Sequence, residues 1–437
     1  MAIARLLHNQ SSDHSGHVKR LEHTSDLIFS NMDLLTSILV RLPLRKLMQF
    51  KCVSKSWLSL IKTPHFLSLR SQVPFHPPSG LFVQQHFSIC NIIDDPVFYF
   101  RERDVYNDSG EIRKLPTFCN DLFACGGNCG TFTCGCGGLR RIRILDSSNG
   151  LLLCCNSYYA EEEKHKQYIY NPTTNQLLAT LPRLTDQNYV CTWSMTLVFC
   201  PSNSPHYKVI ACALRRQIKS KSRQFEIYSS ETKSWRVAGQ PFPYSDGILF
   251  MNGVYCNGSV YWLSKLYSDV NSADCLYFNL NEERLEKFPK PPIRLTLSTI
   301  RNSYFGESDN HLHFIEVSLH STSFHVYELK RDHSGWFVKY HVNLAQLSKA
   351  YPQMINNIHD RNNYKVAVLS LVRRDRFVED DSFLVLDVPG KVMRYNLVKR
   401  NSEEICDYKV LVDQHARNIM RFGGLQVWQY VECHSSV

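Results

Sequence analysis

GVYCNGSVYWLS occupies residues 253–264, and CLYFNLNEERLEKFP follows at residues 275–289. In the first segment, strand-forming residues flank Asn257-Gly258, the dipeptide that most strongly favours a two-residue β-hairpin turn. The second segment predicts another hairpin, with a strand that begins at Cys275, a polar turn, and a returning strand that carries Leu285 and Phe288. Two successive hairpins predict a four-stranded antiparallel unit of about fifty residues.

The same unit recurs along the chain. It is repeated in RIRILDSSNGLLLCCN with YIYNPTTNQLLATLP, in TLVFCPSNSPHYKVIACA with FEIYSSETKSWRV, in SYFGESDNHLHFIEV with FHVYELKRDHSGWFVKYHV, and in VAVLSLV with SFLVLDVPGKVMRYNL. If the third strands begin near Tyr168, Phe225, Cys275, Phe324 and Phe383, the repeat is about fifty residues long, as in kelch-like propellers. The sequence therefore predicts a large all-β domain with a β-propeller fold.

Six four-stranded blades are the predicted number. A poorer copy of the unit at residues 81–116 would add one blade to the five clear ones, and GLQVWQYVE near the C-terminus would supply a strand that closes the ring. Five or seven blades stay open as alternatives because the first and last units are degenerate. A pair of β-sandwiches is a further alternative, although it would not require so regular a period.

A small all-α domain is predicted before the propeller. SNMDLLTSILVRLPLRKLMQFKCVSKSWLSLIKTPHF, residues 30–66, contains three short amphipathic helices. In the first, Leu35, Ile38, Leu39 and Leu42 share one helical face. Thr63 and the proline after it restart the chain as an N-cap and a first-position proline do. A helical unit of this size buries little surface, so its remaining apolar side chains need a partner.

The spacing of this stretch resembles the F-box, especially as it occurs in large plant families. DLLTSILVRLP, FKCVSKSWLSLI and the PHF triplet carry the resemblance. One position departs from the pattern, because the family usually opens with Leu-Pro and this chain has Ser30-Asn31 there. DSSNGLLL and IYNPTTNQ resemble the F-box-associated region that follows the F-box in plant proteins, so the two resemblances cover nearly the whole chain.

The resemblance implies that residues 29–71 bind a Skp-family adaptor, and that residues 81–437 recruit a protein for ubiquitylation by an SCF-type (Skp-cullin-F-box) ligase. On this interpretation the chain is a receptor, it is not itself an enzyme, and it needs no cofactor. The identity of the substrate and the loops that bind it are left open. The residues predicted to bind the adaptor are Leu34, Leu35, Ile38, Leu42, Pro43, Leu47, Val53 and Trp57. Some of these must form the helical core instead.

Charge gives independent support for a docking role. Between Ser30 and Ser71, seven Lys or Arg residues stand against one acid, Asp33, so this segment carries +6 of the chain's formal +10. Such a segment suits the acidic adaptors of this family. A basic three-helix unit also describes many DNA-binding modules, so a nucleic-acid-binding or scaffold protein is one alternative. A propeller enzyme acting on a small molecule, with His, Glu or Tyr side chains converging at one face, is another.

Composition limits the classes of protein to which this chain can belong. With 437 residues, 43% of them hydrophobic, the chain can bury a sizeable core. It contains neither a signal-peptide pattern nor an apolar run of about 18 residues, so we expect no membrane and a location in the nucleus, the cytoplasm or both. Most of the 16 cysteines lie in strand-like runs, as Cys154, Cys212 and Cys275 do, which predicts buried thiols. Residues 1–28 are predicted to be a disordered tail and residues 72–80 a proline-containing linker.

Three local features are candidate sites. Cys125, Cys129, Cys134 and Cys136 could hold zinc, but their spacing lacks paired C-x2-C knuckles, so a flexible insertion is preferred. The basic run from Arg215 to Arg223 predicts a solvated loop, or a site for an acidic or phosphorylated partner. The tryptophans on predicted strands are expected in the cores of blades rather than in a ligand cage: Trp193, Trp235, Trp262 and Trp336. No nucleophile elbow, phosphate loop or H-E-x-x-H motif occurs.

Overall fold

The computed structural model describes residues 31–40, 47, 50, 53–63, 65–66, 69, 80–87, 92–93, 97–100, 141–157, 166–174, 176–184, 189–216, 221–243, 253–264, 275–296, 299–358, 361–373, 381–407, 425–431 and 433. The chain divides into two compact units, residues 1–76 and residues 77–437. Within the described ranges, every helix is too short or too polar to cross a lipid bilayer. The predicted tail at residues 1–28 lies outside these ranges, as does the predicted linker apart from Gly80.

The helical unit contains helix α3 (Met32–Val40) and helix α5 (Lys55–Lys62), and a side chain caps the start of each. Asn31 Oδ1 accepts hydrogen bonds from the backbone N–H groups of Asp33 and Leu34, both at 3.1 Å. Ser54 Oγ accepts one from the N–H of Trp57, also at 3.1 Å. Asn31 stands where the F-box pattern usually has Leu-Pro, and these bonds show that it serves as the N-cap of α3.

These helices correspond to the first and third predicted helices, whereas the second is described only at Leu47 and Phe50. Thr63 Oγ1 accepts a hydrogen bond from the N–H of Phe66 at 3.2 Å, so the predicted N-cap at Thr63 is confirmed. The buried side chains that form the core of the unit are Leu35, Leu39, Val40, Leu47, Trp57, Ile61 and Phe66.

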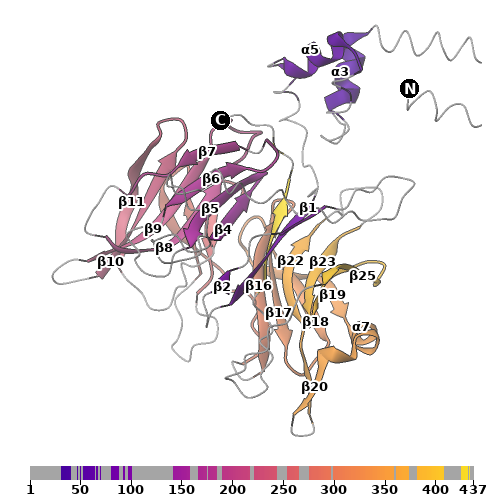
Figure 1. Ribbon diagram of the computed structural model, residues 1–437. Helices are drawn as coiled ribbons and strands as arrows, with labels where there is room; N and C mark the ends of the chain where they lie inside the picture. Colours follow the sequence, from indigo (N-terminus) through magenta and orange to yellow (C-terminus); the bar gives the residue numbers. More distant parts are fainter. Residues whose placement is uncertain are drawn as a thin grey trace, which may run out of the picture. The chain divides into compact units, whose positions relative to one another are not determined.

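Residues 77–437 form a β-propeller with five regular blades, each a sheet of four antiparallel strands joined in chain order (Figure 1). Blade 1 is β4 (Arg141–Ser148), β5 (Leu151–Ser157), β6 (Gln167–Asn171) and β7 (Gln176–Thr180); blade 2 is β8 (Tyr189–Val198), β9 (Lys208–Arg216), β10 (Lys221–Ser229) and β11 (Ser234–Pro243). Blade 3 is β12 (Val254–Cys256), β13 (Ser259–Trp262), β14 (Cys275–Asn279) and β15 (Arg284–Phe288); blade 4 is β16 (Ile300–Ser308), β17 (His311–Ser318), β18 (Ser323–Leu329) and β19 (Trp336–Asn343). Blade 5 is β22 (Ala367–Val372), β23 (Phe383–Val388), β24 (Lys391–Asn396) and β25 (Ser402–Asp407).

The turns explain why these segments form hairpins at these positions. In blades 1, 3 and 4 the first two strands are joined by two residues with positive φ: Asn149-Gly150 (43° and 90°), Asn257-Gly258 (46° and 81°) and Asp309-Asn310 (55° and 58°). That backbone matches the twist of the strands and favours Asn, Asp and Gly. The predicted hairpins at Asn257-Gly258 and Asp309-Asn310 are therefore confirmed.

Blade 5 corrects the alignment of the repeats. Phe383 begins the second strand of its blade rather than the third, because Pro389-Gly390, with φ of 84° at the glycine, leads from β23 directly into β24. Asn396 then accepts the N–H of Val398 at 2.9 Å at the end of β24. The ends of the third strands in blades 1 and 3 have the same cap, from Asn171 and Asn279. VAVLSLV is therefore the first strand of blade 5.

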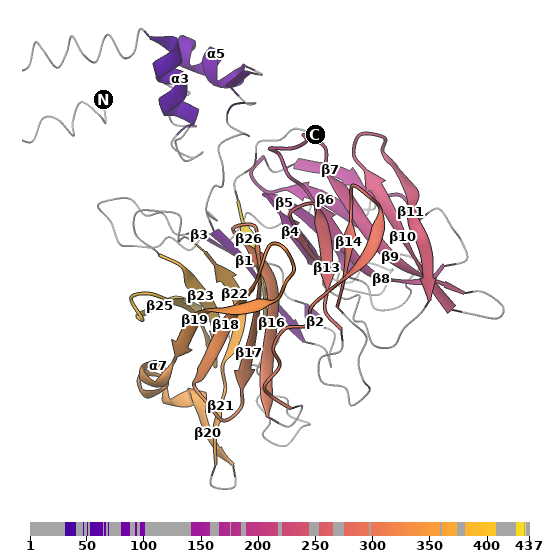
Figure 2. The same ribbon diagram turned by 180° about the vertical axis from the view of Figure 1, so that it is seen from behind.

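The blade number is also corrected, from six regular blades to five. A further sheet completes the ring, but it is not a run of consecutive strands. It contains β1 (Gly80–Phe87), β2 (Ile92–Ile93), β3 (Val97–Phe100) and β26 (Leu425–Tyr430). β26 pairs with β1 from Gly80↔Tyr430 to Gln85↔Leu425, and it contacts both β4 of blade 1 and β22 of blade 5 (Figure 2). The predicted C-terminal strand that closes the ring is confirmed, and we call this sheet the closing sheet.

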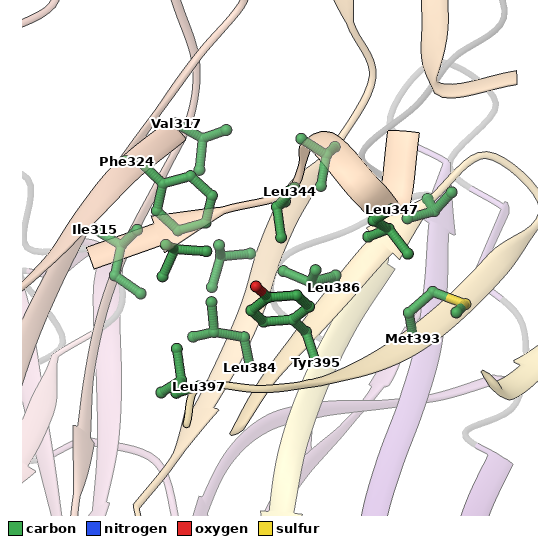
Figure 3. Packing of buried hydrophobic residues seen from close by; sticks show 14 of the residues in the cluster. Ile315, Val317, Phe324, Leu344, Leu347, Leu384, Leu386, Met393, Tyr395 and Leu397 are labelled. Atoms are coloured by element: carbon green, nitrogen blue, oxygen red, sulfur yellow. The ribbon is translucent and has the colours of Figure 1, made fainter. Parts of the chain in front are cut away.

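Adjacent blades are joined by apolar cores and by indole hydrogen bonds. Figure 3 shows the core between blades 4 and 5, where Phe324, Leu384 and Leu386 are among the buried residues. Trp235 Nε1 of blade 2 donates to the carbonyl of Pro182 at 2.8 Å, and Trp336 Nε1 of blade 4 donates to that of Pro289 at 2.9 Å. Each proline lies just after the last strand of the preceding blade, so these two tryptophans belong to the blade structure, as predicted.

The connection between blades 4 and 5 carries secondary structure of its own. It contains α7 (Ala345–Ala350), the 3-10 helix η2 (Pro352–Met354), and a hairpin of β20 (Ile355–Ile358) and β21 (Arg361–Tyr364). Leu347 and Met354 are buried in the core between blades 4 and 5, which anchors this insertion to the propeller. Backbone hydrogen bonds attach it to its neighbours as well, since the N–H of Tyr364 donates to the carbonyl of Leu319 at 2.7 Å.

Candidate functional site

The helical unit exposes a set of large apolar side chains, defined here as the exposed apolar set: Met32 (44% exposed), Leu34 (42%), Ile38 (43%) and Val53 (57%). They account for four of the seven exposed large hydrophobic side chains in the described part of the chain, although the helical unit contributes few of the described residues. Leu34 and Ile38 lie one turn apart on α3 and so share a face. A soluble protein exposes such side chains together where another molecule covers them.

The predicted adaptor-binding residues divide into three groups. Leu34, Ile38 and Val53 are exposed and can contact a partner. Leu35, Leu47 and Trp57 are only 2%, 2% and 8% exposed and pack in the core of the helical unit, as the sequence predicts for some of these residues. Leu42 and Pro43 lie outside the described residues. The sequence interpretation did not include Met32, which is exposed at the start of α3.

The propeller contains a cluster of charged and imidazole groups around Glu328 at the junction of blades 4 and 5. Arg373 Nη1 lies 3.0 Å from the Glu328 carboxylate, and His311 Nε2 and His313 Nε2 each lie 3.6 Å from it. Lys339 Nζ lies 4.0 Å away. The backbone N–H of Arg373 also donates to Ser308 Oγ at 2.8 Å, which ties blade 5 to blade 4.

Protonation in this cluster follows from burial and charge. Burial lowers the pKa values of His311 and His313, so both imidazoles are neutral at neutral pH. Burial also acts to raise the pKa of Glu328, but the neighbouring His313 imidazole and the Arg373 charge outweigh it and hold this pKa below its usual value. Nearby Glu307 is the opposite case, because burial raises its pKa to about 7.

The residues around Glu328 bear on the enzyme and metal-site alternatives. His311, His313 and Glu328 are residue types that bind metals, but Arg373 already supplies the positive charge beside the carboxylate. Among the residues that the structure describes, no group of three or more His, Cys, Asp or Glu side chains is arranged to hold a metal ion. With Glu328 and His313 almost entirely buried, the cluster fits an ionic connection between blades.

The other candidate features of the sequence have different outcomes. Cys125, Cys129, Cys134 and Cys136 lie outside the described residues. The basic run is mostly strand and not loop, since β9 extends to Arg216 and β10 begins at Lys221, and Arg223 is buried. Trp262 is buried in the core between blades 2 and 3, as expected, whereas the side chain of Trp193 is outside the described part. Cys154, Cys212 and Cys275 are buried thiols, as the sequence predicts, and Cys256 is buried as well.

Comparison with known proteins bears on both units. The F-box domain family matches residues 31–69, and the F-box associated beta propeller domain family matches residues 139–308. The chain is 31% identical to F-box protein At5g07610 of Arabidopsis thaliana over 403 residues, which cover 87% of this chain and 86% of that protein. It is 24% identical to F-box only protein 8 (59% of this chain, 79% of that protein) and 23% identical to an F-box/kelch-repeat protein (60% and 65%), both from the same plant.

Proposed function

The chain belongs to the plant-type F-box protein family, and on that premise we propose that it is the substrate-recognition subunit of an SCF-type ubiquitin ligase. The helical unit binds a Skp-family adaptor, and the propeller binds the protein that is to be ubiquitylated. The chain contributes binding and not catalysis. It works in the nucleus, the cytoplasm or both, where the buried thiols of its blades stay reduced.

The observation that carries this proposal is the exposed apolar set. Leu34 and Ile38 stand on the outer face of α3 while Leu35 and Leu39 of the same helix fill the core, so α3 is apolar on two sides. A helix in an isolated small domain needs only one apolar face. Covering a Leu or Ile side chain fully contributes about 1.5–3 kcal/mol, so an adaptor that covers this set gains several kcal/mol.

The mechanism is proximity. A propeller-bound protein is held near the ubiquitin-conjugating enzyme that the adaptor and cullin bring to the same complex, which raises the effective concentration of its lysines. Nothing in the described residues of this chain has to take part in a chemical step. In the Glu328 cluster, the charge of the carboxylate is compensated by Arg373 within the cluster, so the cluster does not favour the enzyme alternative.

The test is adaptor binding by a pair of exposed-site variants. Leu34→Ser combined with Ile38→Ser leaves the core intact because both side chains are about half exposed. We expect binding to a purified Skp-family adaptor to weaken by about 2 kcal/mol or more, which is at least about thirtyfold in Kd. Val237→Ser is the matched control, because Val237 is 51% exposed on blade 2.

Two results would contradict the proposal. The first is a wild-type chain that fails to bind any Skp-family adaptor in a direct binding assay. The second is binding that the helical double variant and the blade 2 control affect equally. If the wild-type chain instead binds nucleic acid with a steep salt dependence through the helical unit, the nucleic-acid alternative replaces the receptor function.

A further inference from the structure

The propeller has two ends with different connections. In a four-stranded antiparallel blade, the turns after the first and third strands lie at one end, and the connections after the second and fourth strands lie at the other. In blades 3 and 4 the first end carries tight turns such as Asn257-Gly258 and Asp309-Asn310. The other end carries, among others, three connections whose described residues are 289–296 with 299, 319–322, and 344–358 with 361–366. We call these three connections the platform.

Hydrogen bonds join the three connections of the platform into one surface. The N–H of Leu319 donates to the carbonyl of Thr299 at 2.8 Å, and the N–H of Tyr364 donates to the carbonyl of Leu319 at 2.7 Å. The N–H of Leu344 donates to the carbonyl of Thr322 at 3.0 Å. Figure 1 shows the α7 and β20 part of the platform extending past the ends of β18 and β19. A ligand at this end would therefore meet a continuous surface rather than separate loops.

The platform is basic. In their sequence these three connections carry five Lys or Arg residues against one acid, Asp360. The Lys and Arg residues of the platform are Lys290, Arg294, Lys349, Arg361 and Lys365. Blade 5, by contrast, pairs Lys391 with Glu404 and Asp407 at its edge. A surface of one charge sign attracts ligands of the opposite sign.

The strand ends below the platform extend this charge. His325 on β18 and His341 on β19 are direct cross-strand neighbours, with ring centroids 4.7 Å apart. Arg294 stands over the ring of Tyr327, with its guanidinium carbon 6.0 Å from the ring centroid. Among the described residues, none of Arg294, His325 and His341 forms an ion pair with a carboxylate. We call these three side chains the cationic triplet.

Glu316 is an acid that contacts the backbone of the platform. Its carboxylate accepts hydrogen bonds from the backbone N–H groups of Arg294 at 2.9 Å and Leu295 at 3.4 Å. Burial, and then the charges of His341 and Arg294, lower the pKa of His325, so this imidazole gains a proton more readily when an anion binds beside it. One guanidinium and two imidazoles stand at these strand ends, and an acidic ligand would favour the protonated imidazoles.

We propose that the platform and the cationic triplet form the docking surface for an acidic segment of the substrate protein, carrying Asp and Glu or a phosphorylated side chain. The inference rests on the proposed receptor function and specifies which end of the propeller binds and what chemistry it selects. Arg294 supplies a planar guanidinium for a carboxylate or phosphate, and the two imidazoles donate to the same anion when protonated. The lysines of the platform attract the acidic flanks.

The experiment uses the full chain and fluorescent peptides. The probes are a short peptide of Asp and Glu with one phosphoserine, the same peptide with serine, and a peptide of equal length with Gln and Lys in place of the acids. We expect the acidic peptides to bind and the basic one not to bind. Arg294→Gln combined with His341→Gln should weaken binding about tenfold for each charge-assisted contact that is lost.

Arg284→Gln is the matched control. Arg284 is an exposed arginine at the start of β15, at the opposite end of its blade from Arg294. If the position of the charge decides peptide binding, this variant should bind within about twofold of wild type. If only the net charge of the chain decides it, both variants should lose affinity per charge removed. Thermal unfolding should show that all variants keep the wild-type fold. Comparing the phosphorylated peptide with its serine counterpart tells which acidic chemistry is preferred.

The outcomes separate the two proposals. A wild-type chain that binds the adaptor but neither acidic peptide overturns the docking surface and leaves the receptor function standing. Equal losses in the triplet variant and the Arg284 control also overturn it, as does tighter binding to single-stranded DNA that competes with the peptide. Peptide binding that the triplet variant abolishes, in a chain that binds no adaptor, supports the surface and refutes the receptor function.

Discussion

Replacing Gly150 by alanine tests how the propeller ring is closed. Gly150 has a φ of +90° in the turn between β4 and β5, and a Cβ added there would lie 2.3 Å from the carbonyl oxygen of Val431 and 2.5 Å from Cβ of Cys433. Both contacts are far shorter than van der Waals distances, so the segment that follows β26 must shift. Gly150→Ala therefore perturbs the turn and the closing sheet together.

The matched control separates these two effects. Gly258 occupies the same place in the corresponding turn of blade 3, with φ of +81°, but a Cβ added there has its nearest neighbour at 3.9 Å. Gly258→Ala should cost only the left-handed backbone strain, about 1–2 kcal/mol. Gly150→Ala should cost that amount plus about 1–3 kcal/mol for the overpacking. The expected difference between the two variants is the second term.

Hydrogen exchange measured by mass spectrometry is the suitable assay. Amides of β26 and β1 should exchange faster in Gly150→Ala than in wild type, because their pairing opens more often, whereas amides of β12 and β13 should be affected in Gly258→Ala. Chemical denaturation of the full chain gives the overall loss of stability for each variant. If both alanine variants lost the same stability, or if β26 kept wild-type protection in Gly150→Ala, the reasoning about ring closure would be wrong.

Three further predictions concern stability. Asp146 is partly buried, and desolvation raises the pKa of its carboxyl to about 7, so the protonated carboxyl stabilises the folded state below the unfolded pKa of about 4, and this stabilisation is lost as the pH rises through about 7. Asp146→Asn should therefore flatten the dependence of the unfolding free energy on pH in that range, and Asp332→Asn, at an exposed site, should not. Trp336→Phe leaves the carbonyl of Pro289 without its indole donor and should cost about 1–3 kcal/mol in chemical denaturation, unless water replaces the donor. Leu39→Ala should cost about 2–5 kcal/mol within the helical unit, because this side chain is 1% exposed, and it should reduce adaptor binding together with helix content measured by circular dichroism.

Hairpins were the part of the fold that the sequence predicted best, because their turns depend on local chemistry. Asn257-Gly258 and Asp309-Asn310 adopt positive φ at both positions, which few other residues tolerate, so strand positions on both sides followed from them. The alignment of blade 5 was wrong because a local turn signal does not tell which strand of the blade precedes it. Pro389-Gly390 is an equally strong turn, but the sequence interpretation placed it after the third strand, when it follows the second.

The sheet that closes the ring and the exposure of single side chains could not be predicted, because both depend on contacts that a short stretch of sequence does not show. The C-terminal strand could be predicted, but the irregular sheet that it shares with β1 could not, because that pairing joins distant residues. In the helical unit, Leu34 and Leu35 are adjacent in sequence and equally apolar, yet one is exposed and the other is buried. The cationic triplet was missed altogether, since Arg294, His325 and His341 are separated in sequence and meet only in the folded blade.

The closing sheet also determines when this protein can finish folding. Gly80 pairs with Tyr430, so the first propeller strand has to wait for a partner that is synthesised 350 residues later. Closing so long a loop is slow, and during translation β1 presents an edge that other chains could pair with. The helical unit precedes β1 and can fold during that time. A shortened product that stops before Leu425 would therefore keep its helical unit and lack a closed propeller, and under the proposed function it would compete in a cell with the intact chain for the adaptor.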